Sequence, residues 1–373
     1  MPELAIIQPG SNDYFCNEHR VVLDKSRAMT LISMINGNGY PVIVSDRAIS
    51  LPDSKQKVIL PTTNQETYSP TPVAEFRVKT VIIKDILCIA FAGEVYSIEQ
   101  VYDWIVDFFL HRPINAQTYK EMLDEIHYGN EISVLFALGG PEFTENRLMV
   151  AYSGEWIRDQ SKEKLDIISC GTGASRWTEH FVNYAPYLER TGIRSVDCKQ
   201  RALLSCISFL SHEQKTTELL QDGWGGGFDV VYYEKGQFHR YENLSYAFYY
   251  CNADSPDRLT SYSVIHNSYL QGNAIVRNLA ADNPKIHIIR QFRDQEPLGQ
   301  KLLTLDCKSY EVVSCIFIYK EGKYHSDLVV FVDDTDPSAP PMLFTTIKDD
   351  KFGVQYRPIY IDKLKEAVRL FLN

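Results

Sequence analysis

Short apolar runs that alternate with turn residues organise the chain from residue 30 onward. Asn36-Gly37-Asn38-Gly39 separates the first two runs and is typical of a tight hairpin turn, and Lys84-Asp85 separates two later runs. Neighbouring runs joined by so short a turn favour antiparallel pairing. The pattern therefore predicts two antiparallel strand pairs, with strands at 31–35, 42–44, 78–83 and 86–91.

A helical spacing of apolar residues replaces this pattern after Gly93. Ser97 followed by Gln100 is typical of a capping box and predicts the start of the first helix. Gly129 follows a second helical pattern and is expected to end it. Together with two later patterns, the spacing predicts helices at 95–109, 116–127, 175–188 and 196–220.

Further strand patterns occur at 132–138, 148–152, near 156, 165–169, 228–233 and 237–241. Runs of strands that are separated from runs of helices are typical of antiparallel sheets with helices stacked outside them. We therefore expect an α+β protein in which residues 30–252 form a four-layer αββα sandwich. Within this range, residues 51–75 are rich in Pro, Ser and Thr and are expected to form an irregular loop.

The two ends of the chain have a different character. Residues 1–29 are mixed in composition and are interpreted as an N-terminal extension or propeptide. Residues 253–373 contain strand candidates and close with an amphipathic helix over 362–372. We expect this last part to form an additional C-terminal α+β region of unknown role.

Charge and cysteine usage exclude several classes of partner. The 38 Lys and Arg residues against 48 Asp and Glu residues give a net charge of −10, and without a basic run this argues against a nucleic-acid partner. No window reaches the roughly 18 apolar residues that span a bilayer, so no membrane partner is expected. The eight cysteines form no CxxC pair and the N-terminus lacks a signal-peptide pattern, which indicates the cytoplasm.

No motif predicts a cofactor or a metal ion. The chain has neither a CxxC pair nor an HExxH sequence, which are common signatures of zinc sites. Gly225-Gly226-Gly227 is not followed by Lys and Ser or Thr, so a phosphate-binding loop is not expected there.

Four polar or small residues stand at the ends of the first predicted strands. Thr30 begins the first strand, Asp46 follows the second, Lys79 lies on the third and Gly93 ends the fourth. Residues at the ends of paired strands can converge on one point. We therefore expect these four residues to form a site.

In this order, residues 30–245 resemble the proteasome β-type subunits and their bacterial relatives, a branch of the N-terminal-nucleophile hydrolases. Gly171-Thr172-Gly173 resembles the family's Gly-Ser-Gly, which would place Thr172 at the supporting serine. Asp222 resembles the aspartate of the family's Asp-x-x-Ser-Gly motif, in which this chain carries Gly225 in place of the serine. The resemblance covers about three-fifths of the chain.

The resemblance implies a chemistry for each residue. An N-terminal Thr30 is the nucleophile because its own free α-amino group can take the hydroxyl proton. Lys79 stays cationic and is held by Asp46, and the backbone N–H of Gly93 is the expected oxyanion donor. The family also forms rings, which implies a homo-oligomer.

Release of Thr30 has three possible outcomes. Residues 1–29 are a propeptide with an unusual Ala28-Met29 junction, or Met29 is the true start and is removed, or Thr30 is never released. The first hypothesis is therefore a threonine hydrolase of peptide or other amide bonds. The alternative is a catalytically silent structural or interaction subunit, which the junction and Gly225 favour.

Overall fold

The computed structural model describes most of the chain, and the statements that follow concern the described residues. These are 3–7, 30–37, 40–51, 57–67, 72–140, 143, 148–161, 165–190, 197–216, 218–280, 284–292, 307–309, 311–332, 340–347 and 351–372. Most of the expected N-terminal extension and residues 38 and 39 of the first expected turn lie outside them.

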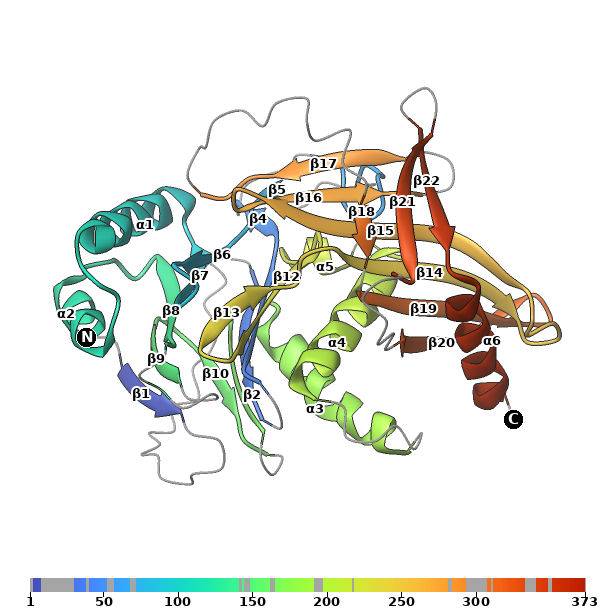
Figure 1. Cartoon of the computed structure of the whole chain (residues 1–373), viewed down its shortest axis with the longest axis horizontal. Coiled ribbons are helices and arrows are strands. Elements are labelled where there is room, and N and C mark those ends of the chain that lie inside the picture. The colour runs from blue at the N-terminus through green and yellow to red at the C-terminus, as the bar shows by residue number, and fades with distance from the viewer. Residues whose placement is uncertain are drawn as a thin grey trace. The chain divides into compact units, whose positions relative to one another are not determined.

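The described chain is mostly β-strand, about 45% strand and 26% helix, in several sheets with six helices (Figure 1). The four-layer αββα sandwich expected from the sequence is therefore wrong. The expectation missed the strands at 244–252, 259–270 and 273–278, which form half of a further six-stranded sheet. Two of them conceal the usual alternation, because 244–252 is almost wholly buried and 259–270 carries many Ser, Thr, Asn and His residues.

The chain forms two compact units. The first contains Met1–Val58, Ser69–Ala202 and Glu218–Arg240, and the second contains Ile59–Tyr68, Leu203–Thr217 and Tyr241–Asn373. The second unit thus begins before the boundary expected at 252, because the strand at 244–252 pairs with strands further along the chain. It also includes the middle of the expected irregular loop.

The first unit contains two large antiparallel sheets and a small one. The five-stranded sheet has the order β1 (Glu3–Ile7), β9 (Leu148–Ser153), β8 (Ile132–Leu138), β7 (Leu87–Gly93), β6 (Thr80–Ile83). The six-stranded sheet has the order β10 (Ile157–Asp159), β11 (Asp166–Cys170), β2 (Ile32–Asn36), β3 (Val42–Asp46), β12 (Phe228–Glu234), β13 (Gln237–Arg240). The small sheet pairs β4 (Ala48–Ser50) with β5 (Val73–Phe76).

One turn and one strand pair in the first unit test predictions made from the sequence. Lys84 and Asp85 have φ of 50° and 60°, the left-handed conformation of a type I′ turn, and the N–H of Ile86 donates to the carbonyl of Ile83 at 3.3 Å, so this expected turn is confirmed. β1 pairs antiparallel with β9, so part of the expected N-terminal extension is a strand of the five-stranded sheet.

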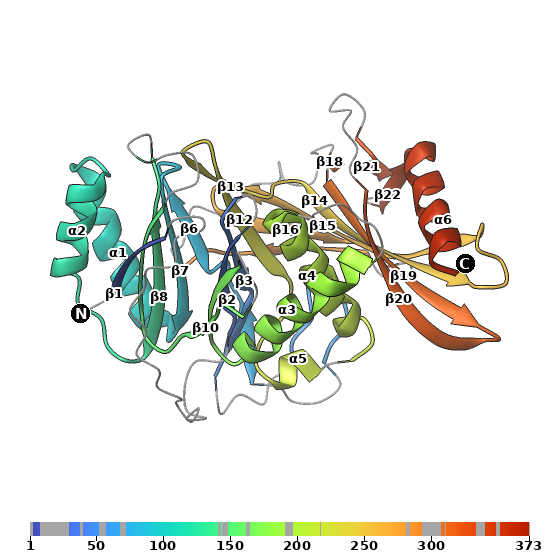
Figure 2. The same cartoon turned by 90° about the horizontal axis from the view of Figure 1, so that it is seen from below.

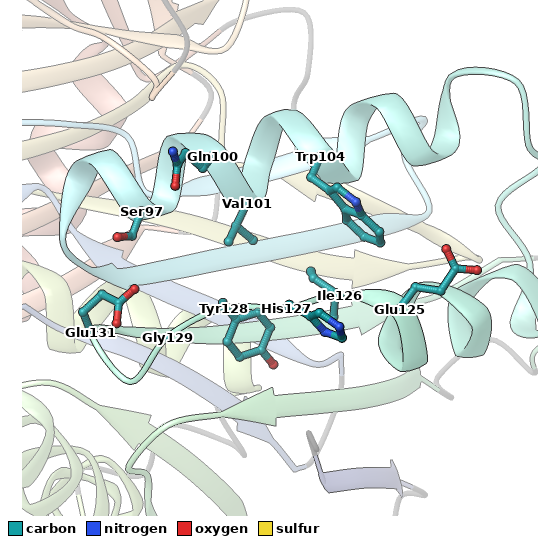
Figure 3. A pocket seen from close by; sticks show the side chains of 10 residues that line it. All are labelled: Ser97, Gln100, Val101, Trp104, Glu125, Ile126, His127, Tyr128, Gly129 and Glu131. Atoms are coloured by element: carbon teal, nitrogen blue, oxygen red, sulfur yellow. The ribbon is translucent and has the colours of Figure 1, made fainter.

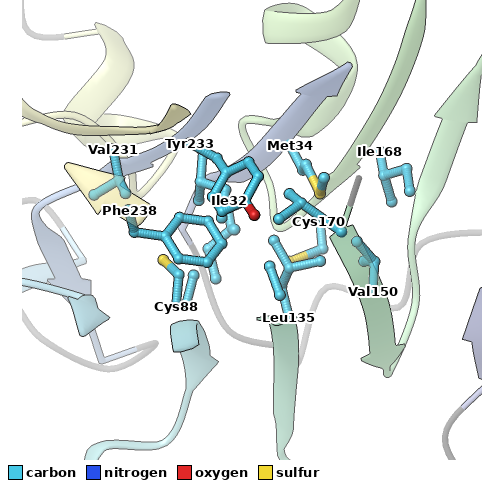
Figure 4. Packing of buried hydrophobic residues seen from close by; sticks show 14 of the residues in the cluster. Ile32, Met34, Cys88, Leu135, Val150, Ile168, Cys170, Val231, Tyr233 and Phe238 are labelled. Carbon is cyan, nitrogen blue, oxygen red and sulfur yellow. The ribbon is translucent and has the colours of Figure 1, made fainter. Parts of the chain in front are cut away.

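A single apolar cluster joins the two large sheets of the first unit (Figure 4). Side chains from β2, β3, β11 and β12 meet side chains from β7, β8 and β9 there. The cluster includes Ile32, Met34, Cys88, Leu135, Val150, Ile168, Cys170, Val231, Tyr233 and Phe238. Burial of this apolar surface holds the two facing sheets in place. Candidate site residues end one strand of each sheet: Asp46 ends β3 and Gly93 ends β7.

Five helices follow the expected positions with changes at their ends: α1 (Val95–Leu110), α2 (Ala116–Glu125), α3 (Ala174–Arg190), α4 (Cys198–Glu213) and α5 (Glu218–Gln221). The capping box expected at Ser97 is wrong, because Ser97 lies inside α1 and donates its hydroxyl to the Glu94 side chain. A capping box occurs instead at α2, between Asn115 and Thr118. The expected helix 196–220 is divided into α4 and α5.

The second unit is built on a six-stranded sheet with the order β17 (Lys285–Ile289), β16 (Asn273–Asn278), β15 (Leu259–Leu270), β14 (Leu244–Asn252), β19 (Glu311–Lys320), β20 (Lys323–Val332). Only the β14 and β19 pair in it is parallel. A three-stranded sheet has the order β18 (Cys307–Ser309), β21 (Met342–Ile347), β22 (Lys351–Tyr356).

The C-terminal helix α6 (Pro358–Leu372) confirms the amphipathic helix expected there. Tyr360, Leu364 and Val368 are buried in a cluster with side chains of β14, β19 and β21. Figure 2 shows α6 beside β21 and β22. Among the described residues, no helix combines the length and the hydropathy that a membrane span requires.

Burial of one face of α6 predicts unequal effects of two leucine substitutions. Leu364 is 0% exposed, so Leu364→Ala should lower the free energy of unfolding by about 2–5 kcal/mol. Leu370 lies on the same helix and is 73% exposed, so Leu370→Ala should change it by less than about 0.5 kcal/mol. Urea denaturation of both variants measures the difference, and equal effects would contradict the packing of α6.

Candidate active site

Thr30, Asp46 and Lys79 meet in the first unit because of how its strands are aligned. β2 pairs with β3 so that Ile32 lies opposite Ser45, and the N–H of Asp46 donates to the carbonyl oxygen of Leu31 at 3.0 Å. This register places Thr30 beside Asp46 at one end of the six-stranded sheet. Lys79 lies just before β6 of the other large sheet, and its carbonyl accepts from the N–H of Phe91 at 3.1 Å.

The three side chains form a closed set of hydrogen bonds. The Thr30 hydroxyl donates to Asp46 Oδ1 at 2.8 Å, and Lys79 Nζ donates to the same oxygen at 2.6 Å. Lys79 Nζ also donates to Thr30 Oγ1. The three residues that the sequence placed at strand ends are thus brought together as expected.

The cluster is buried, and this changes the acid–base behaviour of Lys79. Thr30 is 2% exposed, Asp46 0% and Lys79 1%. Burial lowers the pKa of Lys79 below its ordinary value, because an apolar surrounding disfavours the charged amine, while the charge of Asp46 acts in the opposite direction. A proton can therefore leave Lys79 more readily than it leaves a lysine in water.

Gly225 belongs to the cluster through its backbone. Its N–H donates to Asp46 Oδ2 at 2.8 Å, and its carbonyl oxygen accepts from the N–H groups of Arg47 and Ala48 at 3.2 and 3.0 Å. Its φ of +112° lies in the region that favours glycine. The resembled family carries a serine at this position. In this chain the residue there is Gly225, and it contacts Asp46 through its backbone N–H.

Gly171 and Gly173 contact Thr30 directly, a role that the sequence reasoning did not assign. The N–H of Gly173 donates to the carbonyl oxygen of Thr30 at 3.1 Å. A Cβ on Gly171, whose φ is +92°, would lie 2.0 Å from the same oxygen. The Gly-x-Gly spacing was the available signal, since paired glycines often mark a close approach of two backbones.

Thr172 and Asp222 lie outside this hydrogen-bonded set. The Thr172 hydroxyl donates to the backbone carbonyl of Asp222 at 2.9 Å, and the Asp222 carboxylate lies 3.6 Å from Arg176. Among the described residues, no hydrogen bond joins either side chain to Thr30, Asp46 or Lys79. The hydrogen bond between them joins the turn that contains Thr172 to the turn that contains Asp222. The supporting catalytic roles that the resemblance implies for them stay predictions.

Gly93 is fixed by close packing. Its φ is +131°, and a Cβ there would lie 2.3 Å from the carbonyl oxygen of Glu131 and 2.7 Å from the Cα of Ile132. Glycine is thus required where β7 passes β8. No described hydrogen bond links Gly93 to Thr30, so its role as an oxyanion donor stays a prediction.

A second buried ion pair adjoins the cluster and was also missed. Arg47 follows Asp46, and its Nε and Nη2 atoms donate to Asp229 Oδ1 at 2.9 and 2.8 Å. Both side chains are almost completely buried, and the charge of Asp229 also opposes the lowering of the Lys79 pKa. The partners are 182 residues apart, and an Arg beside an Asp on a strand is too common to reveal such a pair.

The arrangement provides a hydroxyl nucleophile, a nearby amine and a carboxylate that holds both. These groups suit acyl transfer, in which a hydroxyl attacks a carbonyl carbon while a neighbouring group takes its proton. Among the described residues, no group of three or more His, Cys, Asp or Glu side chains is placed to hold a metal ion.

The buried pair predicts a strong effect of removing one charge. Asp229→Asn leaves Arg47 buried opposite a neutral amide, so the free energy of unfolding should fall by about 3–5 kcal/mol. The double variant Arg47→Met with Asp229→Leu should recover most of this loss. Asp166→Asn, which breaks the more exposed Arg158–Asp166 pair, is the control and should cost about 1 kcal/mol or less. Urea denaturation measures all three, and a small loss for Asp229→Asn would contradict the assignment.

No family model matches the chain, and no curated protein matches it. The resemblance to proteasome β-type subunits therefore depends only on the order of the motifs in the sequence, and it stays a prediction.

Proposed function

We propose that the chain hydrolyses peptide or other amide bonds with Thr30 as the nucleophile, after the bond between Met29 and Thr30 has been broken. The observation that carries this proposal is the contact of Thr30 Oγ1 with both Asp46 and Lys79 inside a buried cluster. A serine or threonine hydroxyl becomes a useful nucleophile when a neighbouring base can take its proton. Here both neighbours lie within hydrogen-bonding reach.

The same hydroxyl can release itself. In the intact chain the Thr30 nitrogen is an amide, so the only amine in the cluster is that of Lys79. Burial lowers the pKa of Lys79 and so favours its neutral amine, the form that can act as a base. Thr30 Oγ1 attacks the carbonyl carbon of Met29 as its proton passes to this neutral amine, the C–N bond breaks, and the leaving nitrogen takes the proton back from Lys79. Water then hydrolyses the resulting ester and frees residues 1–29, which leaves Thr30 with a free α-amino group.

Each residue then has a role in the cleavage of a substrate. The α-amino group has an ordinary pKa near neutrality, so it takes the hydroxyl proton as Oγ1 attacks the substrate carbonyl. Lys79 and Asp46 hold Oγ1 in place through the bonds already described. The amine product leaves with a proton, and water cleaves the acyl ester to restore Thr30.

The setting of this activity is also proposed. The described cysteines Cys88, Cys170, Cys198, Cys206, Cys251 and Cys315 are free and buried, which supports a reducing compartment such as the cytoplasm. The homo-oligomer implied by the resemblance stays a prediction.

A catalytically silent subunit is the second candidate function, and the burial of the cluster favours it. Thr30 is only 2% exposed while its nitrogen is still joined to Met29, so a substrate carbonyl has no access to Oγ1 in that state. In a silent subunit the bond before Thr30 persists and the cluster only stabilises the fold.

Covalent labelling by a threonine-directed electrophile such as a β-lactone tests the proposed function. The wild-type chain should be labelled at Thr30, located by peptide mass mapping, and Thr30→Ser should retain labelling because it keeps the hydroxyl. Thr30→Ala should not be labelled. Lys79→Met should be labelled at least about 100-fold more slowly, because Lys79 is the base in the self-release of Thr30 on which labelling depends.

Thr118→Ala is the matched control for this experiment. Its hydroxyl donates to the carbonyl of Pro113 and not to the cluster, so labelling at Thr30 should persist. Absence of label on Thr30 in the wild-type chain, or equal labelling of Thr30→Ala, would favour the silent subunit.

A further inference from the structure

Strand β1 belongs to the part of the chain that the proposed self-release would cut off. It pairs antiparallel with β9 through five residues, from Glu3 opposite Tyr152 to Ile7 opposite Leu148. β1 is the edge strand of the five-stranded sheet, and Figure 1 shows it beside β9. Cleavage of the bond before Thr30 removes the covalent link, but it breaks none of these backbone pairs.

The β9 strand is apolar and would become an edge strand if β1 left. Its residues 148–153 read Leu-Met-Val-Ala-Tyr-Ser and include no charged residue and no proline. Met149, Val150 and Ala151 are between 0% and 3% exposed. The other side of β9 is already paired with β8. An apolar edge without charge or proline is the kind of edge that pairs with another chain.

The opposite edge of the same sheet is protected by other means. β6 has only four residues, and Lys84 follows it directly. The carbonyl oxygen of Thr80 in β6 also accepts from Arg240 Nη2 at 2.5 Å. Short length and charged side chains keep an edge strand from pairing with a further strand. β9 has no charged residue, so β1 itself is the element that covers its edge.

The effect of β1 is confined to this edge. The first unit also contains a cavity of about 310 Å³ between α1 and the connection from α2 to β8 (Figure 3). The residues that line the cavity come from α1, the end of α2 and that connection, and none of them belongs to β1 or β9. Departure of β1 would therefore uncover the β9 edge without removing a wall of the cavity.

We propose that the N-terminal fragment, residues 1–29, stays bound to β9 after the bond before Thr30 is broken, so that the active protein is a noncovalent complex of two chains. The cleavage rests on the proposed function, whereas the pairing of β1 with β9 does not. β1 is already seated in register when the bond breaks. A second copy of the chain would have to find the edge from solution and displace β1.

Mass spectrometry of the purified wild-type chain under two conditions tests the retention. In denaturing solvent, self-release should give two masses, those of residues 1–29 and 30–373. Under native conditions the same sample should give one mass, equal to their sum. A native mass of residues 30–373 alone would overturn the proposal. A native mass of two copies of residues 30–373 would also overturn it, because the edge would then be taken by a second copy.

A form that is cut by an added protease separates this inference from the proposed function. Thr30→Ala cannot release itself, and a recognition sequence for a site-specific protease is inserted in it after Asn17. The cut protein should keep residues 1–17 in its native mass. If the wild-type chain stays intact and this cut form keeps its fragment, the proposed function fails and edge binding stands. If the fragment leaves the cut form, edge binding fails whatever the wild-type chain does.

Proline substitutions locate the retention to β1. Successive residues of an edge strand direct their N–H groups alternately toward and away from the neighbouring strand. The double variant Leu4→Pro with Ala5→Pro therefore removes one N–H that bonds β9, and the cut form should lose its fragment. Ser11→Pro with Asn12→Pro lies outside β1, is the matched control and should keep it. Circular dichroism checks that both are folded, and equal retention in both would overturn the proposal.

Discussion

The carboxylate of Asp46 is the interaction on which the rest of the site depends. Its Oδ1 atom accepts from the Thr30 hydroxyl, the N–H of Leu31 and Lys79 Nζ, and its Oδ2 atom accepts from the N–H of Gly225. A buried carboxylate is tolerated only when its oxygens are paired and hydrogen-bonded. The Asp46 side chain thus joins the residues that precede β2, the facing five-stranded sheet through Lys79, and the glycine-rich turn before β12.

Charge balance explains how this buried arrangement persists. Lys79 and Arg47 are each paired with an aspartate, Asp46 and Asp229, so four buried charges sum to zero. Desolvation still lowers the pKa of Lys79, because the burial of an amine outweighs the two attractive charges. Burial, and not the charge balance, thus favours loss of a proton from Lys79 relative to a lysine in water.

The sequence predicted the residues whose position follows from strand pairing, and it failed where long-range packing decides. Thr30 and Asp46 could be predicted because a hairpin places strand ends side by side. Arg47 and Asp229 could not, because they pair across 182 residues. The fold expected from the sequence was wrong in part because the polar residues of β15 (Leu259–Leu270) concealed a strand. Which face of that strand is buried is set by the neighbouring strands. The expected role of Thr172 rested on its type, whereas its hydroxyl meets a backbone carbonyl.

If the Thr30 cluster breaks the bond before Thr30, the protein should release residues 1–29 without help from another enzyme. The intact mass of the purified chain, measured beside that of Thr30→Ala, shows whether this happens. The wild-type chain should lack residues 1–29 while Thr30→Ala retains them, because only the hydroxyl differs. If both proteins keep residues 1–29 after prolonged incubation, the cluster only stabilises the fold and Thr30 is not a nucleophile.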